Sequence, residues 1–366
     1  MQSLLFLPDI SGFTKFIHET EIEHSQHIIQ GLLEVLLNTN KIDLIVSEIE
    51  GDAIFFYRPG KPPSFEEILE QIKKMFLGFH LYIKELENDR VCDCGACSTA
   101  INLSLKFIVH FGEVSLSKIK EHTKLLGSDV IIAHRLLKNN LNEQEYVLFS
   151  AQYIQFAGET ESAERTDWVK KLVGSVSYEH IGEINYTYIL LSGLKSEIPK
   201  ITPEYQARRY KRPILVEHEI SAPMRLIYNT IIDLSLRLNW TDGLRDIKYN
   251  KGEIPRVGVK HICALPFGNV EIETVERRFK KGVIEYAERA TNMKIVHNAT
   301  TFYILKDTTA GTIVSVEFHY EPLPVLGRVI DLFLRPIMKK SLRRSLLNLK
   351  HFCEHRLSDG LKEQTR

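Results

Sequence analysis

Two things are missing from this sequence, a long apolar run and an excess of charge of one sign, and each absence excludes a class of protein. No apolar run approaches the roughly 20 residues that a membrane-spanning helix needs. Lys and Arg together number 47, as do Asp and Glu, so no net charge attracts the whole molecule to nucleic acid or an anionic membrane. The first ten residues lack the basic region and long apolar core of a secretion signal. We therefore expect no transmembrane segment and no nucleic-acid partner.

Cysteine is also scarce, and its placement argues against a secreted protein. Of the five cysteines, Cys92, Cys94 and Cys97 crowd into one loop, whereas Cys263 and Cys353 stand alone. Such spacing does not form the disulfide framework of a small secreted domain. We predict a cytoplasmic location, where thiols stay reduced.

A chain of 366 residues suggests two domains, and one segment suits a linker between them. Residues 192–213, SGLKSEIPKITPEYQARRYKRP, contain three prolines and several charges and have no sustained periodicity. We predict a first domain over residues 1–192, a linker over 193–212, a second domain over 213–358 and a tail over 359–366.

In the first domain, strand and helix patterns alternate. SLLFL is typical of a buried strand, apolar spacing over residues 28–37 predicts a helix, and residues 42–58 predict a hairpin that turns at Gly51-Asp52. Ser64 and Glu67 form a capping box, and alternation over residues 101–109 predicts a half-buried strand. The order βαββαβ, with additions, predicts an α+β sandwich of the ferredoxin-like type.

After the linker, the order of elements changes. A strand over residues 214–220 is followed by helical spacing with Ser221 as its expected N-cap, by several strand-like runs, and by a long helix over roughly 325–356. We predict a curved antiparallel sheet around that helix, a fold that usually encloses an apolar cavity. The residues that line the cavity are not identified. The aromatic candidates, each of which is otherwise ordinary core, are Trp240, Tyr286, Phe302 and Phe318.

The segment LPDISGFTKF places Asp9 between an apolar strand and a small-residue turn that opens a helix, and Asp52 lies at the turn of the next hairpin. If that hairpin pairs beside the first strand, both carboxylates reach one end of the sheet. Two aspartates there can bind magnesium or manganese ions. The alternative is a turn residue and a solvated acid near a helix start. The backbone groups that would cradle a triphosphate are those of Ile10, Ser11, Gly12, Phe13 and Thr14.

Four successive segments, LLFLPDISGFT, EIEGDAIFFY, LKFIVHFGEV and GSDVIIAHRL, resemble the signatures of class III nucleotidyl (adenylate/guanylate) cyclases. The resemblance covers nearly all of residues 1–192. It implies that Asp9 and Asp52 bind magnesium or manganese and that Arg135 is the catalytic arginine that stabilises the transition-state phosphates. Because the family's sites form between two such domains, it also implies a homodimer that binds a nucleoside triphosphate.

The sequence departs from that family at three positions. Glu48 stands in place of the base-selecting lysine, Ser128 in place of the acid that helps select the purine, and Ile131 in place of the transition-state asparagine. Losing one oriented polar contact to a transition state typically costs a few kcal/mol. We therefore expect a degenerate domain that binds a metal–nucleotide, and any remaining activity would be that of a cyclase, a phosphorus–oxygen lyase.

The loop CDCGACSTA is the second candidate site. Its C-x-C-x-x-C spacing places Cys92, Cys94 and Cys97 close enough to bind one structural zinc ion, with a fourth ligand from elsewhere in the chain. The alternative is three reduced thiols in an exposed loop. The candidates for the fourth ligand are His80, His110 and His122.

Residues 213–356 resemble the START-like (SRPBCC) superfamily, which includes polyketide cyclases and lipid carriers. The resemblance rests on element order, on Ser-Ala-Pro at 221–223 and on Trp240 near the end of the helices. It implies a helix-grip fold that binds a hydrophobic small molecule.

The final helix interleaves basic and apolar residues over 328–352, a pattern that can lie on an anionic membrane. In this fold its apolar stripe should pack on the sheet, so we expect its basic face to be merely solvated.

Three functions stay open at this point. In the first, a signalling protein, the cyclase-like domain binds metal–nucleotide and the START-like domain senses an apolar molecule. In the second, a non-catalytic protein carries a lipid or another hydrophobic ligand and uses the cyclase-like domain as a dimerisation scaffold. The third, an enzyme acting on a polyketide or similar substrate, ranks last because the sequence shows no acid–base constellation in the second domain.

Overall fold

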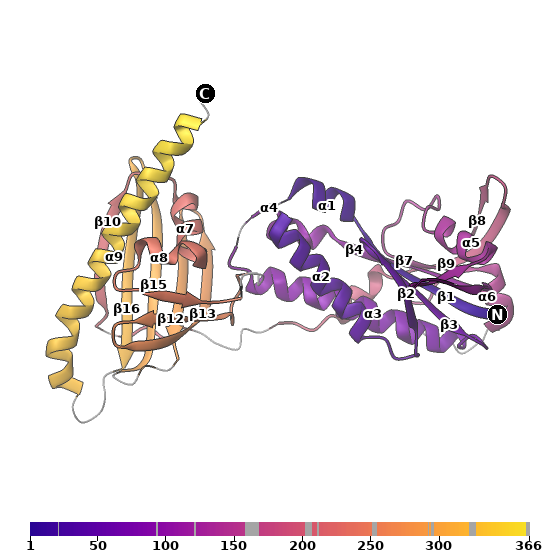
Figure 1. The fold of residues 1–366 in the computed structure, drawn as a ribbon, viewed down its shortest axis with the longest axis horizontal. Coiled ribbons are helices and arrows are strands. Elements are labelled where there is room, and N and C mark those ends of the chain that lie inside the picture. The colour runs from indigo at the N-terminus through magenta and orange to yellow at the C-terminus, as the bar shows by residue number, and fades with distance from the viewer. Residues whose placement is uncertain are drawn as a thin grey trace. The chain divides into compact units, whose positions relative to one another are not determined.

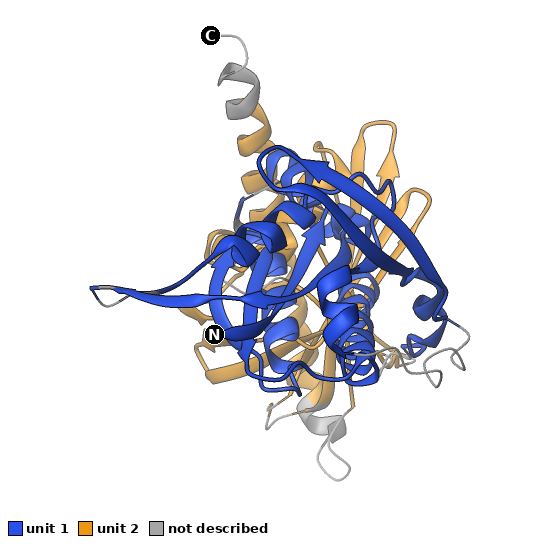
Figure 2. Ribbon diagram, turned by 90° about the vertical axis from the view of Figure 1, so that its right-hand side faces the viewer, with its two compact units in different colours: residues 1–88, 94–201 blue, residues 89–93, 202–366 orange. Residues whose placement is uncertain are grey.

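The computed structural model describes residues 1–20, 22–92, 94–120, 122–157, 168–201, 207–210, 212–250, 255–291, 293, 296–321 and 327–363. The chain forms two compact units, which Figure 2 colours separately. Unit 1 comprises residues 1–88 and 94–201, and unit 2 comprises residues 89–93 and 202–366. Each unit has its own sheet (Figure 1).

Unit 1 is built on a seven-stranded sheet with the order β2-β3-β1-β4-β7-β9-β8. β4 and β7 run parallel, and the other neighbouring strands are antiparallel. Two further strands, β5 (Ser115–Ile119) and β6 (His122–Leu126), pair as a separate ribbon. The strands of the main sheet are β1 (Gln2–Ser11), β2 (Ile45–Glu50), β3 (Ala53–Pro59), β4 (Ser104–Glu113), β7 (Tyr146–Ser150), β8 (Lys171–Tyr178) and β9 (Gly182–Leu190).

Helices cover both faces of this sheet. Leu148 of β7 packs in the cluster formed with α5 (Ser128–Leu136), whereas its neighbour Phe149 contacts Phe65 of α3 (Phe65–Asp89) with ring centroids 4.9 Å apart. Because successive side chains of a strand point to opposite faces, α3 and α5 lie on opposite sides. The predicted capping box is confirmed, since the amides of Ser64 and Glu67 each donate to the other's side chain. The remaining helical segments are α1 (Phe13–Glu19), α2 (Ile22–Asn38), α4 (Gly95–Thr99), η1 (Ala100–Asn102), α6 (Ala151–Ala157) and η3 (Ser192–Glu197).

The strand predicted to be half-buried is buried on both faces. β4 begins at Ser104, and its side chains on alternate faces, such as Phe107 and Ile108, are fully buried. Ile101 precedes the strand, in η1, and is 48% exposed. The prediction was wrong because β4 lies in the middle of the sheet, between β1 and β7 and under helices on both sides.

Unit 2 is an antiparallel sheet with the order β10-β16-β15-β14-β13-β12-β11. Its strands are β10 (Ile214–Ile220), β11 (Asp246–Lys248), β12 (Lys260–Leu265), β13 (Gly268–Lys280), β14 (Val283–Ala290), β15 (His297–Thr308) and β16 (Gly311–Glu321). Between β10 and β11 lie α7 (Met224–Ile232), η4 (Leu234–Leu236) and α8 (Arg237–Trp240). The expected N-cap was wrong: α7 starts after Pro223, and the Ser221 amide instead donates to the Glu354 carboxylate at 2.9 Å.

The long helix α9 (Gly327–Glu363) closes unit 2 and extends beyond its predicted end. It runs alongside the sheet (Figure 1). Its Leu334, Met338 and Leu342 pack against a cluster that includes Ile214 and Phe318 of the sheet. The predicted α+β fold class is confirmed: a sheet covered by helices in unit 1, and an antiparallel sheet with a long C-terminal helix, the helix-grip arrangement, in unit 2. Among the described helices, none is long and apolar enough to cross a membrane.

Candidate functional site

Asp9 and Asp52 come together at one end of the unit 1 sheet. Asp9 lies near the end of β1 and pairs with Ala53, the residue that follows Asp52. The Ile10 amide donates a hydrogen bond to the Asp52 carbonyl oxygen at 3.0 Å. The hairpin turns at Gly51 and Asp52 as predicted, and Gly51 has a φ of 60°, which glycine adopts without strain.

Both carboxylates lie in surroundings that disfavour their charged form. Burial raises the pKa of Asp9, an effect that Lys106 partly offsets with its Nζ 3.3 Å from the Asp9 Oδ1. Burial also raises the pKa of Asp52, and the nearby charge of Asp9 raises it further. Two carboxylates that repel each other favour a cation between them. Asp9 and Asp52 could therefore hold a divalent cation, although Lys106 already neutralises part of their charge.

The turn after Asp9 uses some of the backbone groups predicted to cradle phosphates. The Ile10 amide is bonded to Asp52, and Ser11 belongs to β1, where it pairs with Ser104 of β4. Gly12 has a φ of 89° and precedes α1, whose first residues are Phe13 and Thr14. Amides in the first turn of a helix lack intrahelical partners. Phe13 and Thr14 are therefore the better placed of the five predicted residues to meet an anion.

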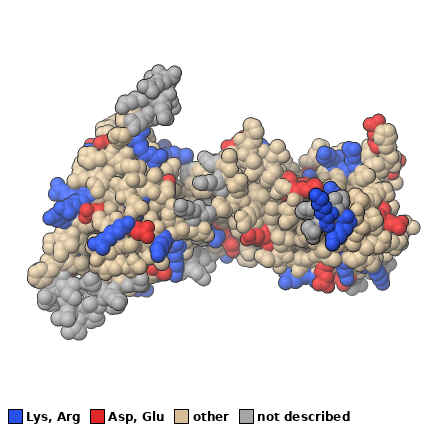
Figure 3. All heavy atoms as spheres, in the orientation of Figure 1, with Lys and Arg blue, Asp and Glu red and all other residues tan. Residues whose placement is uncertain are grey.

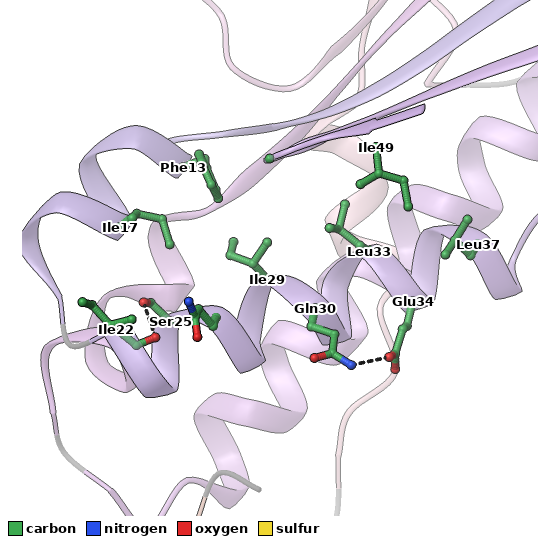
Figure 4. A pocket seen from close by; sticks show the side chains of 12 residues that line it. Phe13, Ile17, Ile22, Ser25, Ile29, Gln30, Leu33, Glu34, Leu37 and Ile49 are labelled. Carbon is green, nitrogen blue, oxygen red and sulfur yellow. Dashed lines mark hydrogen bonds between the residues drawn. The ribbon is translucent and has the colours of Figure 1, made fainter. Parts of the chain in front are cut away.

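An apolar hollow of about 490 Å³ lies in unit 1 beside this turn (Figure 4). It also borders Gly51, at the turn that carries Asp52. Its main polar feature is a 2.8 Å hydrogen bond from the Gln30 amide to the Glu34 carboxylate. Its apolar walls come from α1, α2 and β2 and include Phe13, Ile17, Ile29, Leu33, Leu37 and Ile49.

The other positions assigned by the cyclase resemblance lie on α5 and β2. Arg135 is exposed near the end of α5, where its carbonyl oxygen accepts a hydrogen bond from the Tyr178 hydroxyl at 2.6 Å. The Glu48 carboxylate lies 3.8 Å from the Nε2 of His134, the residue before Arg135. Ile131 is 56% exposed, so an apolar side chain faces solvent where the family has an asparagine.

The three cysteines form a cluster with a histidine that the sequence did not indicate. One ligand atom each from His24, Cys92, Cys94 and Cys97 lies within 4.8 Å of all the others. The His24 Nδ1 is 3.2 Å from the Cys94 Sγ and 3.6 Å from the Cys97 Sγ. Tetrahedral zinc with bonds of about 2.0–2.3 Å needs ligand atoms about 3.4–3.8 Å apart. These residues therefore can hold a metal ion.

Local structure arranges the ligands. Cys94 is the N-cap of α4, and its sulfur accepts a hydrogen bond from the Cys97 amide at 3.4 Å. Cys92 precedes Cys94 by two residues, so the chain itself keeps it within reach. His24 lies in the first turn of α2, which contacts α4.

The predicted fourth ligands are engaged elsewhere. The His80 Nε2 lies 3.2 Å from the Glu145 carboxylate. His110 is fully buried, with its Nδ1 2.7 Å from the Ser150 hydroxyl and its Nε2 3.0 Å from the Asp129 carboxylate. The side chain of His122 lies outside the described residues. The prediction of His80 or His110 was therefore wrong, and His24 takes that place.

Unit 2 contains a buried polar network that the sequence did not predict. Arg237 of α8 forms a two-pronged ion pair with Glu288 of β14, and the two side chains are 4% and 5% exposed. The Tyr286 hydroxyl also donates to Glu288 at 2.8 Å, and Tyr303 lies 3.4 Å from the Arg237 guanidinium. Burial is the largest single influence and raises the pKa of Glu288, but Arg237, His261 and Tyr286 together lower that pKa below its ordinary value. The inner face of the sheet therefore holds a charged pair in an apolar surround.

His261 of β12 lies next to this network, and its burial predicts a pH-dependent stability for unit 2. Burial lowers the pKa of His261 from 6.5 to about 4, and its Nε2 has no hydrogen-bond partner among the described residues. Below pH 6.5 the unfolded chain therefore binds a proton that the folded unit does not bind until about pH 4. The stability of unit 2 should be complete above pH 6.5 and should fall by about 3 kcal/mol towards pH 4.

We expect His261→Leu to remove this loss of stability, as measured by urea denaturation across that pH range. The difference between the wild-type and variant profiles isolates the histidine from the carboxylates, which titrate in both proteins. Parallel profiles would contradict the prediction.

The aromatic candidates for the cavity lie on two faces of the sheet. Trp240 contacts Tyr303, which stacks on Tyr286 next to the charged pair. Phe302 lies on the opposite face, because its neighbour Tyr303 points inward and Phe302 packs in another cluster, under Arg209. Phe318 packs near α9. Phe302 therefore does not lie on the inner face and does not line a cavity there.

Two family models match the chain. One, described as "Protein of unknown function (DUF2652)", matches residues 29–146, and one described as "Polyketide cyclase / dehydrase and lipid transport" matches residues 214–354. Among similar solved structures, the guanylyl cyclase Cya2 is 15% identical with a TM-score of 0.36, over 52% of this chain and 91% of that chain. The protein MLL2253 from Mesorhizobium loti is 15% identical with a TM-score of 0.31, over 39% of this chain and 98% of that chain.

A relative from Mycobacterium tuberculosis, the "Uncharacterized protein Rv2561/Rv2562", is similar to this chain in its amino-acid sequence. It is 33% identical over 176 residues, which are 48% of this chain and 77% of the relative. The chain therefore belongs to the same family as this mycobacterial protein.

Proposed function

We propose that the protein is a two-unit signalling protein, in which unit 1 binds a metal–nucleotide and unit 2 senses a hydrophobic small molecule. The observation that carries the first half is the pair Asp9 and Asp52, whose pKa values are both raised at one end of the sheet. A divalent cation there would neutralise the carboxylates and bind nucleotide phosphates. The helix-grip fold and the match to the lipid-transport model support the second half.

Little cyclase turnover is expected from unit 1. Glu48 and Ile131 offer neither a base-selecting lysine nor a ribose-binding amide, whereas Arg135 is retained on the exposed part of α5. In a homodimer Arg135 would face the aspartates of the other chain. A nucleotide would then act as a bound signal, and turnover would be weak or absent.

Asp52→Asn should weaken binding of manganese–ATP or manganese–GTP by about ten- to a hundredfold, because it removes one of the two carboxylate ligands. Isothermal titration of the full chain measures this affinity. Glu50→Gln is the matched control, since Glu50 is an exposed acid of the same hairpin and should leave affinity unchanged. Equal affinities for wild type and Asp52→Asn would contradict nucleotide binding at this site.

Product analysis after long incubation with ATP or GTP and manganese separates binding from turnover. Asp9→Asn/Asp52→Asn serves as the inactive control. A cyclic nucleotide formed only by the wild type would identify a working cyclase with substituted base-selecting groups.

A second function is supported by different observations. Lys106 lies 3.3 Å from the Asp9 carboxylate and can take the place of a metal ion there. Unit 1 also exposes Ile45, Val46, Ile49 and Ile131, which a second copy could cover. In this case unit 1 is a dimerisation scaffold and unit 2 a non-catalytic carrier of a hydrophobic ligand. A stable dimer without nucleotide affinity would favour this function.

The buried network suggests what unit 2 would bind. Donors on its inner face without a partner among the described residues include the Arg237 Nε and the Trp240 Nε1, and the His261 Nε2 also lacks a partner there. An apolar molecule that carries a hydrogen-bond acceptor would satisfy them.

We also propose that the cluster of His24 and the three cysteines binds structural zinc, and that the protein is cytoplasmic.

A further inference from the structure

The outer face of α9 exposes large apolar side chains. Leu332, Phe333 and Ile337 are 74%, 70% and 65% exposed, although Leu334 and Met338 of the same turns pack on the sheet. The first half of α9 is therefore apolar on two sides. Only one of these sides is needed to hold the helix on the sheet.

Cations continue the same face towards the C-terminus. Lys339, Lys340, Arg343 and Arg344 are all exposed, and residues 332–351 contain no acidic side chain. Phe333, Ile337, Lys340 and Arg344 are spaced by four, three and four residues, which places them on one stripe of the helix. Figure 3 shows Lys and Arg side chains over the part of unit 2 where α9 lies in Figure 1.

Two other basic residues of the helix, Arg335 and Lys350, have structural partners. The Arg335 guanidinium donates to the carbonyl oxygens of Arg212 and Pro213, before β10. The Lys350 ammonium donates to the Glu219 carbonyl oxygen and lies 3.7 Å from Glu354. Lys339, Lys340, Arg343 and Arg344 are thus distinct from these two residues, which fasten α9 to the sheet.

We infer that this face of α9 docks on an anionic lipid surface. A stripe that is apolar at one end and cationic at the other matches the boundary between acyl chains and anionic head groups. A helix face is convex, and a bilayer accepts such a ridge without a matching groove. Long Lys and Arg side chains can also keep their charges among head groups while their stems lie on apolar surface. The helix lies on the membrane surface and does not span it.

Flotation of the full chain with vesicles tests this inference. The protein should float with phosphatidylcholine vesicles that contain phosphatidylserine, and salt should reduce this binding. Lys340→Gln/Arg344→Gln should lower the partition coefficient by about 25-fold, at about fivefold for each cation removed. Phe333→Ser/Ile337→Ser should lower it by about tenfold or more. These side chains are exposed, so thermal unfolding of the variants should match the wild type.

Lys280→Gln/Lys281→Gln is the matched control, because it removes the same charge from the exposed end of β13 and the turn that follows it. It should leave vesicle binding unchanged. Equal binding to pure phosphatidylcholine would overturn the inference, as would no binding at low salt. An equal loss in the control variant would also overturn it, by showing a response to net charge alone. Self-association that Phe333→Ser abolishes, without vesicle binding, would overturn it in favour of a second copy of the chain.

Discussion

Glu288→Gln should lower the free energy of unfolding of unit 2 by about 3–5 kcal/mol. The substitution keeps the size of the side chain but leaves the guanidinium of Arg237 buried without its opposite charge. Tyr286 also loses the carboxylate that accepts its hydrogen bond. Calorimetry of the full chain should show the transition of unit 2 lowered by roughly 10 °C.

Two further variants test whether the buried, unpaired charge of Arg237 causes the loss of stability. Glu285→Gln changes the same residue type on the same strand, but its partner Arg209 is 42% exposed and keeps Glu317. Its cost should be about 1 kcal/mol or less. Arg237→Met/Glu288→Leu removes both charges and should recover most of the stability, since a buried ion pair is often replaceable by apolar groups. A Glu288→Gln protein as stable as the wild type would contradict this account.

The sequence predicted the parts of the fold that depend on neighbouring residues. The hairpin turn at Gly51-Asp52 and the capping box of Ser64 and Glu67 involve residues within a few positions of each other. The prediction that Asp9 and Asp52 lie close together required one assumption, that the hairpin pairs beside the first strand. That pairing is observed between β1 and β3.

Burial on both faces could not be predicted in the same way. Apolar alternation over residues 101–109 is equally compatible with an edge strand and a central strand, because the sequence does not say what covers each face. The pairing of β4 with β1 and β7 decides this, and it involves residues far apart in the chain. The prediction that Ser221 is the N-cap of α7 was wrong for another reason. Ser221 carries a good capping side chain, but the helix starts after Pro223, a residue that is common at the start of a helix.

The buried pair was missed because charged residues are usually exposed. Arg237 and Glu288 are 51 positions apart, and nothing near Arg237 indicates burial. A weak signal was present in VIEYAERA, where Glu288 shares the parity of Ile284 and Tyr286, which are both buried. A polar residue in phase with buried apolar neighbours is expected to have a buried partner.

The candidate ligand His24 shows a similar limit. The cysteine spacing predicted a three-sulfur loop, but the candidate fourth ligand lies 70 positions before Cys94, and a histidine in a helix has no local mark of ligation. His27, one turn further along α2, has the same appearance in the sequence. Only the packing of α4 on α2 distinguishes the two.

One zinc ion per chain should copurify with the untagged protein, and its removal should reduce the stability of the folded chain. A chelator should therefore release close to one equivalent of zinc and lower the unfolding temperature, because metal binding free energy adds to folding free energy. After release, three additional thiols should react with a thiol reagent, since metal-bound thiolates are protected. The residues expected to change are Cys92, Cys94 and Cys97.

His24 and His27 provide the decisive comparison for this site. His24→Gln should lose most of the bound zinc, whereas His27→Gln, the same change on the same helix, should keep it. His24→Cys should restore binding, because four thiolates also form a tetrahedral zinc site. Elemental analysis gives the metal content of each protein. If the wild type contains no metal and His24→Gln is as stable as His27→Gln, the four side chains are neighbours by packing alone and the zinc site is wrong.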